Sequence, residues 1–111
     1  MSVEVKVLVT SKIMEITQQT QYTATNCRAI IDVVTITNTS SSNAVFSLNL
    51  IPKGSAADSS NLFVKNRSIA PNESYRCPEI VGHSLEDGGS ISTIAGTASA
   101  LIMRISGREI T

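Results

Sequence analysis

Hydrophobic and polar residues alternate at every second position over much of this chain, and that is the period of a β-strand. The first such run covers residues 3–10 and has polar residues at the alternate positions. Its apolar side consists of four valines, namely Val3, Val5, Val7 and Val9. Because the four share one side, the pattern predicts a strand with that face buried.

Two further runs stand on either side of the polar stretch 38–43, which reads NTSSSN. Residues 29–38 are apolar on both sides except at Asp32, which predicts a central strand. Residues 45–52 alternate again, with Phe46, Leu48 and Leu50 on the inward side. A turn between two such runs predicts that they form a hairpin.

The rest of the chain predicts short strands separated by turns. We expect strands at residues 62–68, 74–77, 90–95 and 98–107, a polar loop at Lys53–Asn61, and a turn at Pro71-Asn72. The expected fold is all-β: one antiparallel β-sandwich, jelly-roll or Ig-like, of about seven or eight short strands. At most one short helical turn is expected, near residues 78–85, where Pro78 can open it.

Length and composition limit the partners that we expect. The 111 residues predict one domain over residues 1–111, and a chain with 4% aromatic residues must build its core from aliphatic side chains. Nine basic residues balance nine acidic ones without forming a basic stripe, which argues against nucleic-acid binding. No apolar stretch approaches the ~20 residues of a membrane span, and no secretory signal is recognisable. We therefore expect no membrane partner and assembly in a cytoplasm.

Residues that could carry chemistry are few and scattered. His83 is the only histidine, so a metal site would lack the convergent ligands that zinc needs. The adjacent Glu86 and Asp87 precede two glycines and fit a solvated turn better than an acid–base pair. Cys27 and Cys77 fit two buried thiols, with one disulfide as the alternative. The sequence predicts no catalytic, cofactor-binding or metal-binding residue, and no enzyme.

The second half of the chain contains an ordered series of turn and strand segments that resembles a known group of proteins. The series consists of residues 46–54 (FSLNLIPKG), 61–62 (NL), 69–75 (IAPNESY), 78–83 (PEIVGH), Leu85 and 105–109 (ISGRE). It is similar to small structural proteins of tailed-bacteriophage virions, most of all to the capsid decoration (cement, or staple) proteins of short-tailed phages. The similarity extends from about Ile36 to Glu109 and leaves the N-terminal segment outside it.

This resemblance implies a virion protein on the outer surface of the head, bound to the major capsid protein and self-associated as a homodimer or other oligomer. The N-terminal strand, within an arm at residues 1–28, can pair with its own sheet or with a neighbouring subunit. We expect contacts at Val3, Val5, Val7 and Val9, and at Lys53, Asp58 and Asn61 of the polar loop. The alternatives are a neck or tail component, and a β-sandwich module that binds carbohydrate or a host surface.

Overall fold

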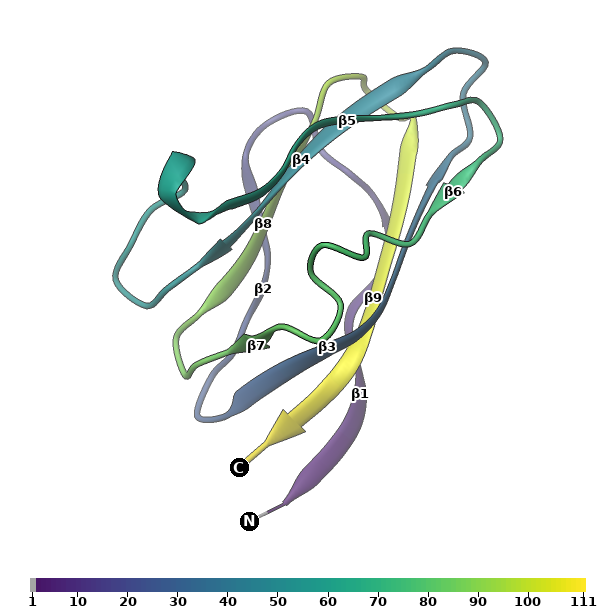
Figure 1. The fold of residues 1–111 in the computed structure, drawn as a ribbon. Helices are drawn as coiled ribbons and strands as arrows, with labels where there is room; N and C mark the ends of the chain where they lie inside the picture. Colours follow the sequence, from purple (N-terminus) through teal and green to yellow (C-terminus); the bar gives the residue numbers. More distant parts are fainter. Residues whose placement is uncertain (1) are drawn as a thin grey trace.

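Two antiparallel β-sheets pack face to face in the computed structural model, which describes residues 2–111 (Figure 1). The first sheet has the order β1 (Val3–Ile13), β9 (Leu101–Ile110), β3 (Arg28–Asn38), β6 (Ser74–Tyr75), and β7 (Ser84–Leu85) also pairs with β3. The second sheet has the order β2 (Gln19–Thr23), β8 (Ser90–Ala95), β4 (Ala44–Ile51), β5 (Leu62–Ile69). The predicted β-sandwich is confirmed. Its described strands number nine: β1 and β3 are longer than expected, and β9 begins and ends three residues later than the predicted strand at residues 98–107.

The core between the sheets is aliphatic, as the scarcity of aromatic residues predicted. Alternate residues of β9, namely Leu101, Met103 and Ile105, are buried, while Arg104 between them is exposed. Phe46 on β4 is the largest fully buried side chain. The inward faces of both sheets therefore meet in one apolar layer, which is the usual core of a sandwich.

The predicted hairpin between residues 29–38 and 45–52 is wrong. β3 lies in the first sheet and β4 in the second. The turn between them therefore leads from one sheet to the other and does not join two paired strands. The buried side chain of Asn38 holds this crossing: its Nδ2 donates to the carbonyls of Ser42 and Ile69, and its Oδ1 accepts from the Ser40 amide. All of these polar atoms are thus hydrogen-bonded, as buried polar groups in folded proteins usually are.

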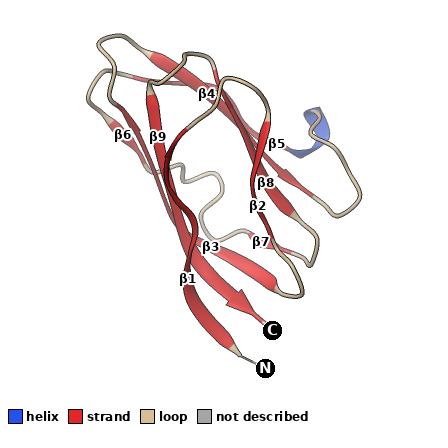
Figure 2. Cartoon of the chain, turned by 180° about the vertical axis from the view of Figure 1, so that it is seen from behind, coloured by secondary structure: helices blue, strands red, loops and turns tan. Residues whose placement is uncertain are grey.

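At most one short helical turn was expected near residues 78–85, and the described chain has its one helical turn at a different place. Residues 78–82 form successive turns, closed by bonds from the Ile80 amide to the Cys77 carbonyl and from the His83 amide to the Ile80 carbonyl. The 3-10 helix lies at Ser59–Asn61 instead, where Figure 2 shows it before β5. Asp58 caps it by accepting from the Ser60 amide, which is the usual start of a helical turn.

The stretch 69–83 joins the two sheets. β5 ends at Ile69 in the second sheet and β6 begins at Ser74 in the first, so the chain turns from one layer to the other at Pro71-Asn72. Asn72 has a φ of 63°, a conformation that asparagine tolerates better than most residues. The turn predicted at Pro71-Asn72 is confirmed. No helix among the described residues has the length and apolar character needed to cross a membrane.

The first sheet is distorted on both sides of Gly107 in β9. The register between β1 and β9 shifts between Val7 and Val9, and the register between β3 and β9 shifts between Ile31 and Val33. A side chain at position 107 would overlap the Ile30 carbonyl oxygen and come within 2.9 Å of the Leu8 Cδ1 atom. Glycine is needed here because the neighbouring strands bulge toward β9.

Replacing Gly107 by alanine should therefore destabilise the protein. We expect Gly107→Ala to lower the free energy of unfolding by about 1–3 kcal/mol, because the Ile30 backbone must shift to admit the methyl group. Urea denaturation measures the change. Ser106→Ala, on the partly exposed opposite face of the same strand, is the matched control and should change stability by less than about 0.5 kcal/mol. Equal stability of the two variants would contradict the steric argument.

Candidate protein-contact surfaces

The four N-terminal valines do not share one buried face. Val3 and Val5 are exposed, with 52% and 81% of their surface accessible, whereas Val9 is buried in the core. The reason is the bulge at Leu8: an extra residue in β1 reverses the alternation, so that Val9 turns inward and the earlier valines turn outward. Val9 is therefore wrong as a contact residue. We call Val3, Val5 and the half-buried Val7 the valine face.

The opposite side of this segment carries charge. Glu4 and Lys6 of β1 lie on the same side as Glu109 of β9, whose carboxylate accepts from the Lys6 Nζ at 3.1 Å and from the Tyr22 hydroxyl. The hydrogen bond from Tyr22, and then that from Lys6, hold the pKa of Glu109 below its usual value. Burial, together with the bond to Glu109, raises the pKa of Tyr22. Through Glu109, this cluster connects β1 and the C-terminal end of β9 in the first sheet to β2 in the second sheet.

The loop at Lys53–Asn61 is held by a buried amide rather than by its charges. Asn61, expected as a contact residue, is buried: its Oδ1 accepts from Asn49 Nδ2 at 2.6 Å, and its Nδ2 donates to the Ala56 carbonyl. Asn61 is therefore wrong as a contact residue, because its polar atoms are occupied by the loop itself. Asp58 is exposed, but its carboxylate caps the 3-10 helix through Ser60, and these bonds lower its pKa.

Lys53 is exposed and lies at a groove of about 340 Å³ beside the loop. The walls of this groove include Phe63 of β5 and His83, whose rings meet edge to face with centroids 5.1 Å apart. Of the three loop residues predicted to make contacts, Lys53 is thus the exposed one whose charged group has no ion pair among the described residues, while its side-chain carbons lie against Gly88.

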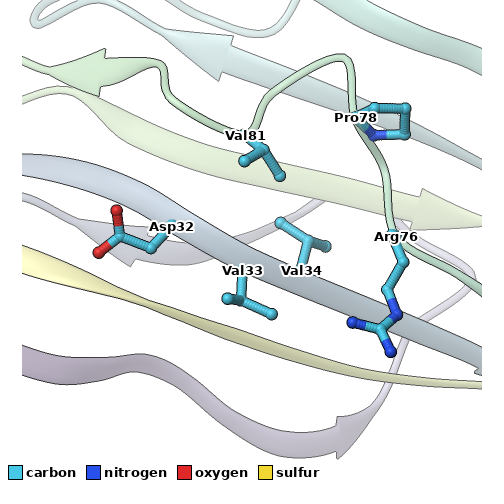
Figure 3. A pocket seen from close by; sticks show the side chains of 6 residues that line it. All are labelled: Asp32, Val33, Val34, Arg76, Pro78 and Val81. Atoms are coloured by element: carbon cyan, nitrogen blue, oxygen red, sulfur yellow. The ribbon is translucent and has the colours of Figure 1, made fainter.

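A second groove, of about 370 Å³, lies where β3 lacks a neighbouring strand (Figure 3). Within the described chain, β6 pairs with β3 at Ile36 and Thr37, and β7 pairs at Ala29 and Ile30, so residues 32–35 have no strand partner on this side. Figure 3 shows Val33 and Val34 below Pro78 and Val81, with Asp32 and Arg76 at opposite ends. Both carboxylate oxygens of Asp32 accept from Arg108, which lowers the pKa of Asp32.

The residues that the sequence offered for catalysis or metal binding lie in different environments: the two cysteines are buried, whereas the histidine and the adjacent acidic pair are exposed. Cys77 is fully buried, and burial raises the pKa of its thiol to about 12, so it is a poor nucleophile. His83 is exposed. Glu86 and Asp87 lie on an exposed turn, where Asp87 accepts from the Asn26 amide. Cys27 and Cys77 are both free and buried. Residues 2–111 contain no group of three or more histidine, cysteine, aspartate or glutamate side chains that could hold a metal ion.

Sequence reasoning missed the groove beside β3, although one signal for it was present. Asp32 interrupts an otherwise apolar run, and it is the extra residue in the bulge opposite Gly107. The bulge turns Val33 outward, where 47% of its surface is exposed. A charged residue inside a run of β-branched residues can thus mark a change of face.

No protein-family model, curated protein or solved structure matches this chain. The resemblance to phage virion proteins therefore stays a prediction, and the contact surfaces are argued from their own geometry.

Loss of charge at Glu109 should lower stability in a pH-dependent way. The folded-state pKa is below the unfolded value, so the carboxylate stabilises the fold above about pH 4.5, and this contribution is lost as the pH falls through the folded pKa. We expect Glu109→Gln to lower the free energy of unfolding by no more than about 1 kcal/mol at pH 7, because the ion pair is partly exposed.

Urea titrations of wild type and Glu109→Gln at pH 7 and near pH 2 measure this difference. It should shrink toward zero at the lower pH, where both side chains are uncharged. The control is Glu73→Gln, an exposed carboxylate outside the ion pairs of the described residues, which should show no such pH dependence. A difference for Glu109→Gln that is the same at both pH values would contradict the role of the charge.

Removing the Asn61 side chain should loosen the loop. Asn61→Ala leaves the buried Asn49 amide without one of its acceptors and frees the Ala56 carbonyl, so we expect a loss of about 1–3 kcal/mol in unfolding free energy. Limited proteolysis should then cut within residues 53–61 faster than in wild type. Ser59→Ala, at an exposed position of the same helical turn, is the control. Unchanged cleavage would mean that Asn61 does not hold the loop.

Proposed function

We propose that this protein is a structural component of a bacteriophage virion that decorates the outer surface of the head and stabilises the lattice of the major capsid protein. It is assembled in the host cytoplasm and acts by binding, without a cofactor. The resemblance of the chain from about Ile36 to Glu109 to decoration proteins supports the proposal. Among the structural features, the valine face carries most weight, since it places exposed apolar side chains on a strand held rigidly by β9.

The valine face fits protein contact better than it fits a soluble monomer's surface. Val5 is the most exposed of the large apolar side chains in the described chain, and Val3 is close to it on the same side of β1. Exposed apolar residues that lie together on one face commonly mark a binding site. Because hydrogen bonds to β9 already order the segment, a partner would cover it at little cost in conformational entropy.

Stabilisation of a capsid would follow from mass action. A subunit that binds the assembled lattice and not its dissociated parts stabilises the lattice by its binding free energy. The effect is repeated at every equivalent site on the shell, so even a modest affinity per site has a large total effect. A small rigid sandwich suits this role, because its core need not rearrange when its edges and loops make contact.

Binding to expanded heads tests the proposal. Purified protein, mixed with expanded heads assembled from the major capsid protein of the same phage, should sediment with them and raise their disruption temperature. The double variant Val3→Thr/Val5→Thr keeps strand-forming residues but removes apolar surface, and should bind about tenfold more weakly. Ile16→Thr, after the end of β1 and outside the valine face, is the matched control for loss of an exposed apolar side chain and should bind like wild type.

Two results would count against decoration of the head. One is an unchanged disruption temperature at saturating occupancy. The other is a low copy number in purified virions, since a neck or tail component is present in far fewer copies than the capsid protein. Quantitative gel analysis of virions separates these cases, and binding of free glycans in place of heads would favour a carbohydrate-binding module.

A further inference from the structure

The outer edge of β1 is open. β1 is the last strand of the first sheet, and within residues 2–111 no strand pairs with it on the side away from β9. Ser2 and Thr111 exchange both backbone hydrogen bonds, so by the alternation of an antiparallel ladder the backbone groups of Glu4 and Lys6 also point toward β9. The amide and carbonyl groups of Val3, Val5 and Val7 consequently point toward the open edge.

The sequence at this edge is complementary to itself. Residues 3–7 read Val-Glu-Val-Lys-Val, so reversing the direction of the segment keeps the valines in place and exchanges the negative charge for the positive one. Two copies placed antiparallel with Val5 opposite Val5 would put Glu4 of one copy opposite Lys6 of the other, twice. We propose that β1 pairs in this register with β1 of a second copy of this chain, joining the two first sheets into one continuous sheet.

Charge selects this register over its neighbours. The open-edge groups belong to the odd-numbered residues, so the pairing can shift only in steps that keep odd residues opposite odd residues. Centring the two-fold axis on Glu4 or on Lys6 sets two like charges directly opposite each other, which destabilises a strand pair. Centring it on Val5 makes both charged pairs attractive. The bulge at Leu8 ends the regular edge just beyond Val7, so the paired segment is short.

The charges within one subunit also favour the pairing. Glu4 lies directly opposite Glu109 on β9, so two like charges are neighbours, and the ammonium group of Lys6 binds Glu109 at 3.1 Å. No ion pair of Glu4 is present in the described part of the chain. In the pair of subunits, Lys6 of the second copy would flank Glu4 from the other side and offset the repulsion.

The pairing leaves the valine face uncovered. A two-fold axis between antiparallel edge strands is perpendicular to the sheet, so the outward faces of both copies lie on the same side. The valines of the two strands then form one apolar stripe across the junction. This inference does not rest on the proposed function, since the pairing is a property of the purified protein alone.

Charge reversal tests the pairing. Strand-edge interfaces are small and belong to the transient class, so sedimentation of the wild type should be followed up to about 1 mM. We expect a dimer, and we expect Glu4→Lys and Lys6→Glu each to weaken it by about tenfold or more, because each variant sets like charges opposite each other at both symmetric positions.

The decisive measurement is the mixture of the two single variants. Each is repelled by itself, yet the two together restore both attractive pairs, so the mixture should dimerise with about wild-type affinity. The double variant Glu4→Lys/Lys6→Glu is again complementary to itself and should also dimerise. Recovery in these two samples shows that the single variants had not merely unfolded.

A charge reversal elsewhere is the control. Lys65→Glu lies at an exposed position of β5 in the second sheet and should leave the dimer unchanged. A wild type that stays monomeric at about 1 mM overturns the proposal. So does a dimer that resists both single reversals, a mixture that fails to associate, or a dimer that is lost with Lys65→Glu.

Discussion

The close approach of β3 to β9 at Gly107 is the constraint on which the rest of the first sheet depends. With no side chain at this position, the Ile30 carbonyl can lie against β9, and both neighbouring strands accommodate an extra residue, Leu8 in β1 and Asp32 in β3. These two bulges decide which side chains reach solvent. The one in β1 turns the first three valines outward, and the one in β3 turns Val33 outward beside the groove of Figure 3. The valine face and the exposed Val33 are therefore both consequences of bulges beside Gly107.

The alternating pattern of the sequence predicted the fold class, the aliphatic core and most strand positions, because each of these depends on residues close together in the chain. The final strand shows this well, since Leu101, Met103 and Ile105 face inward as their spacing indicated. What the pattern could not predict depends on contacts between distant residues. The face of Val9 depends on Gly107, and the burial of Asn61 depends on Asn49. The crossing after β3 depends on a bond from Asn38 to Ile69, which no local periodicity reveals.

The candidate surfaces lie on different parts of one rigid scaffold. The valine face and the open edge of β1 belong to the projecting end of the first sheet, whereas Lys53 and the Phe63–His83 pair border a groove beside the β4–β5 loop. Each combines exposed apolar atoms with a few charged groups, which is the usual composition of a protein-contact surface. Separate surfaces allow the protein to contact its own copy and a different partner at the same time.

The place of β9 in the first sheet also determines when that sheet can form. β9 is the last strand in the sequence, yet it lies between β1 and β3 and pairs with both, so Val3 finds its partner only at Ile110. A growing chain cannot complete this sheet until residues 101–110 have been synthesised, and until then β1 and β3 both lack their main partner. Pairing between such distant segments is slow compared with the formation of local structure. Formation of the first sheet is thus expected to wait for β9, with β1 and β3 exposed to other chains in the interval.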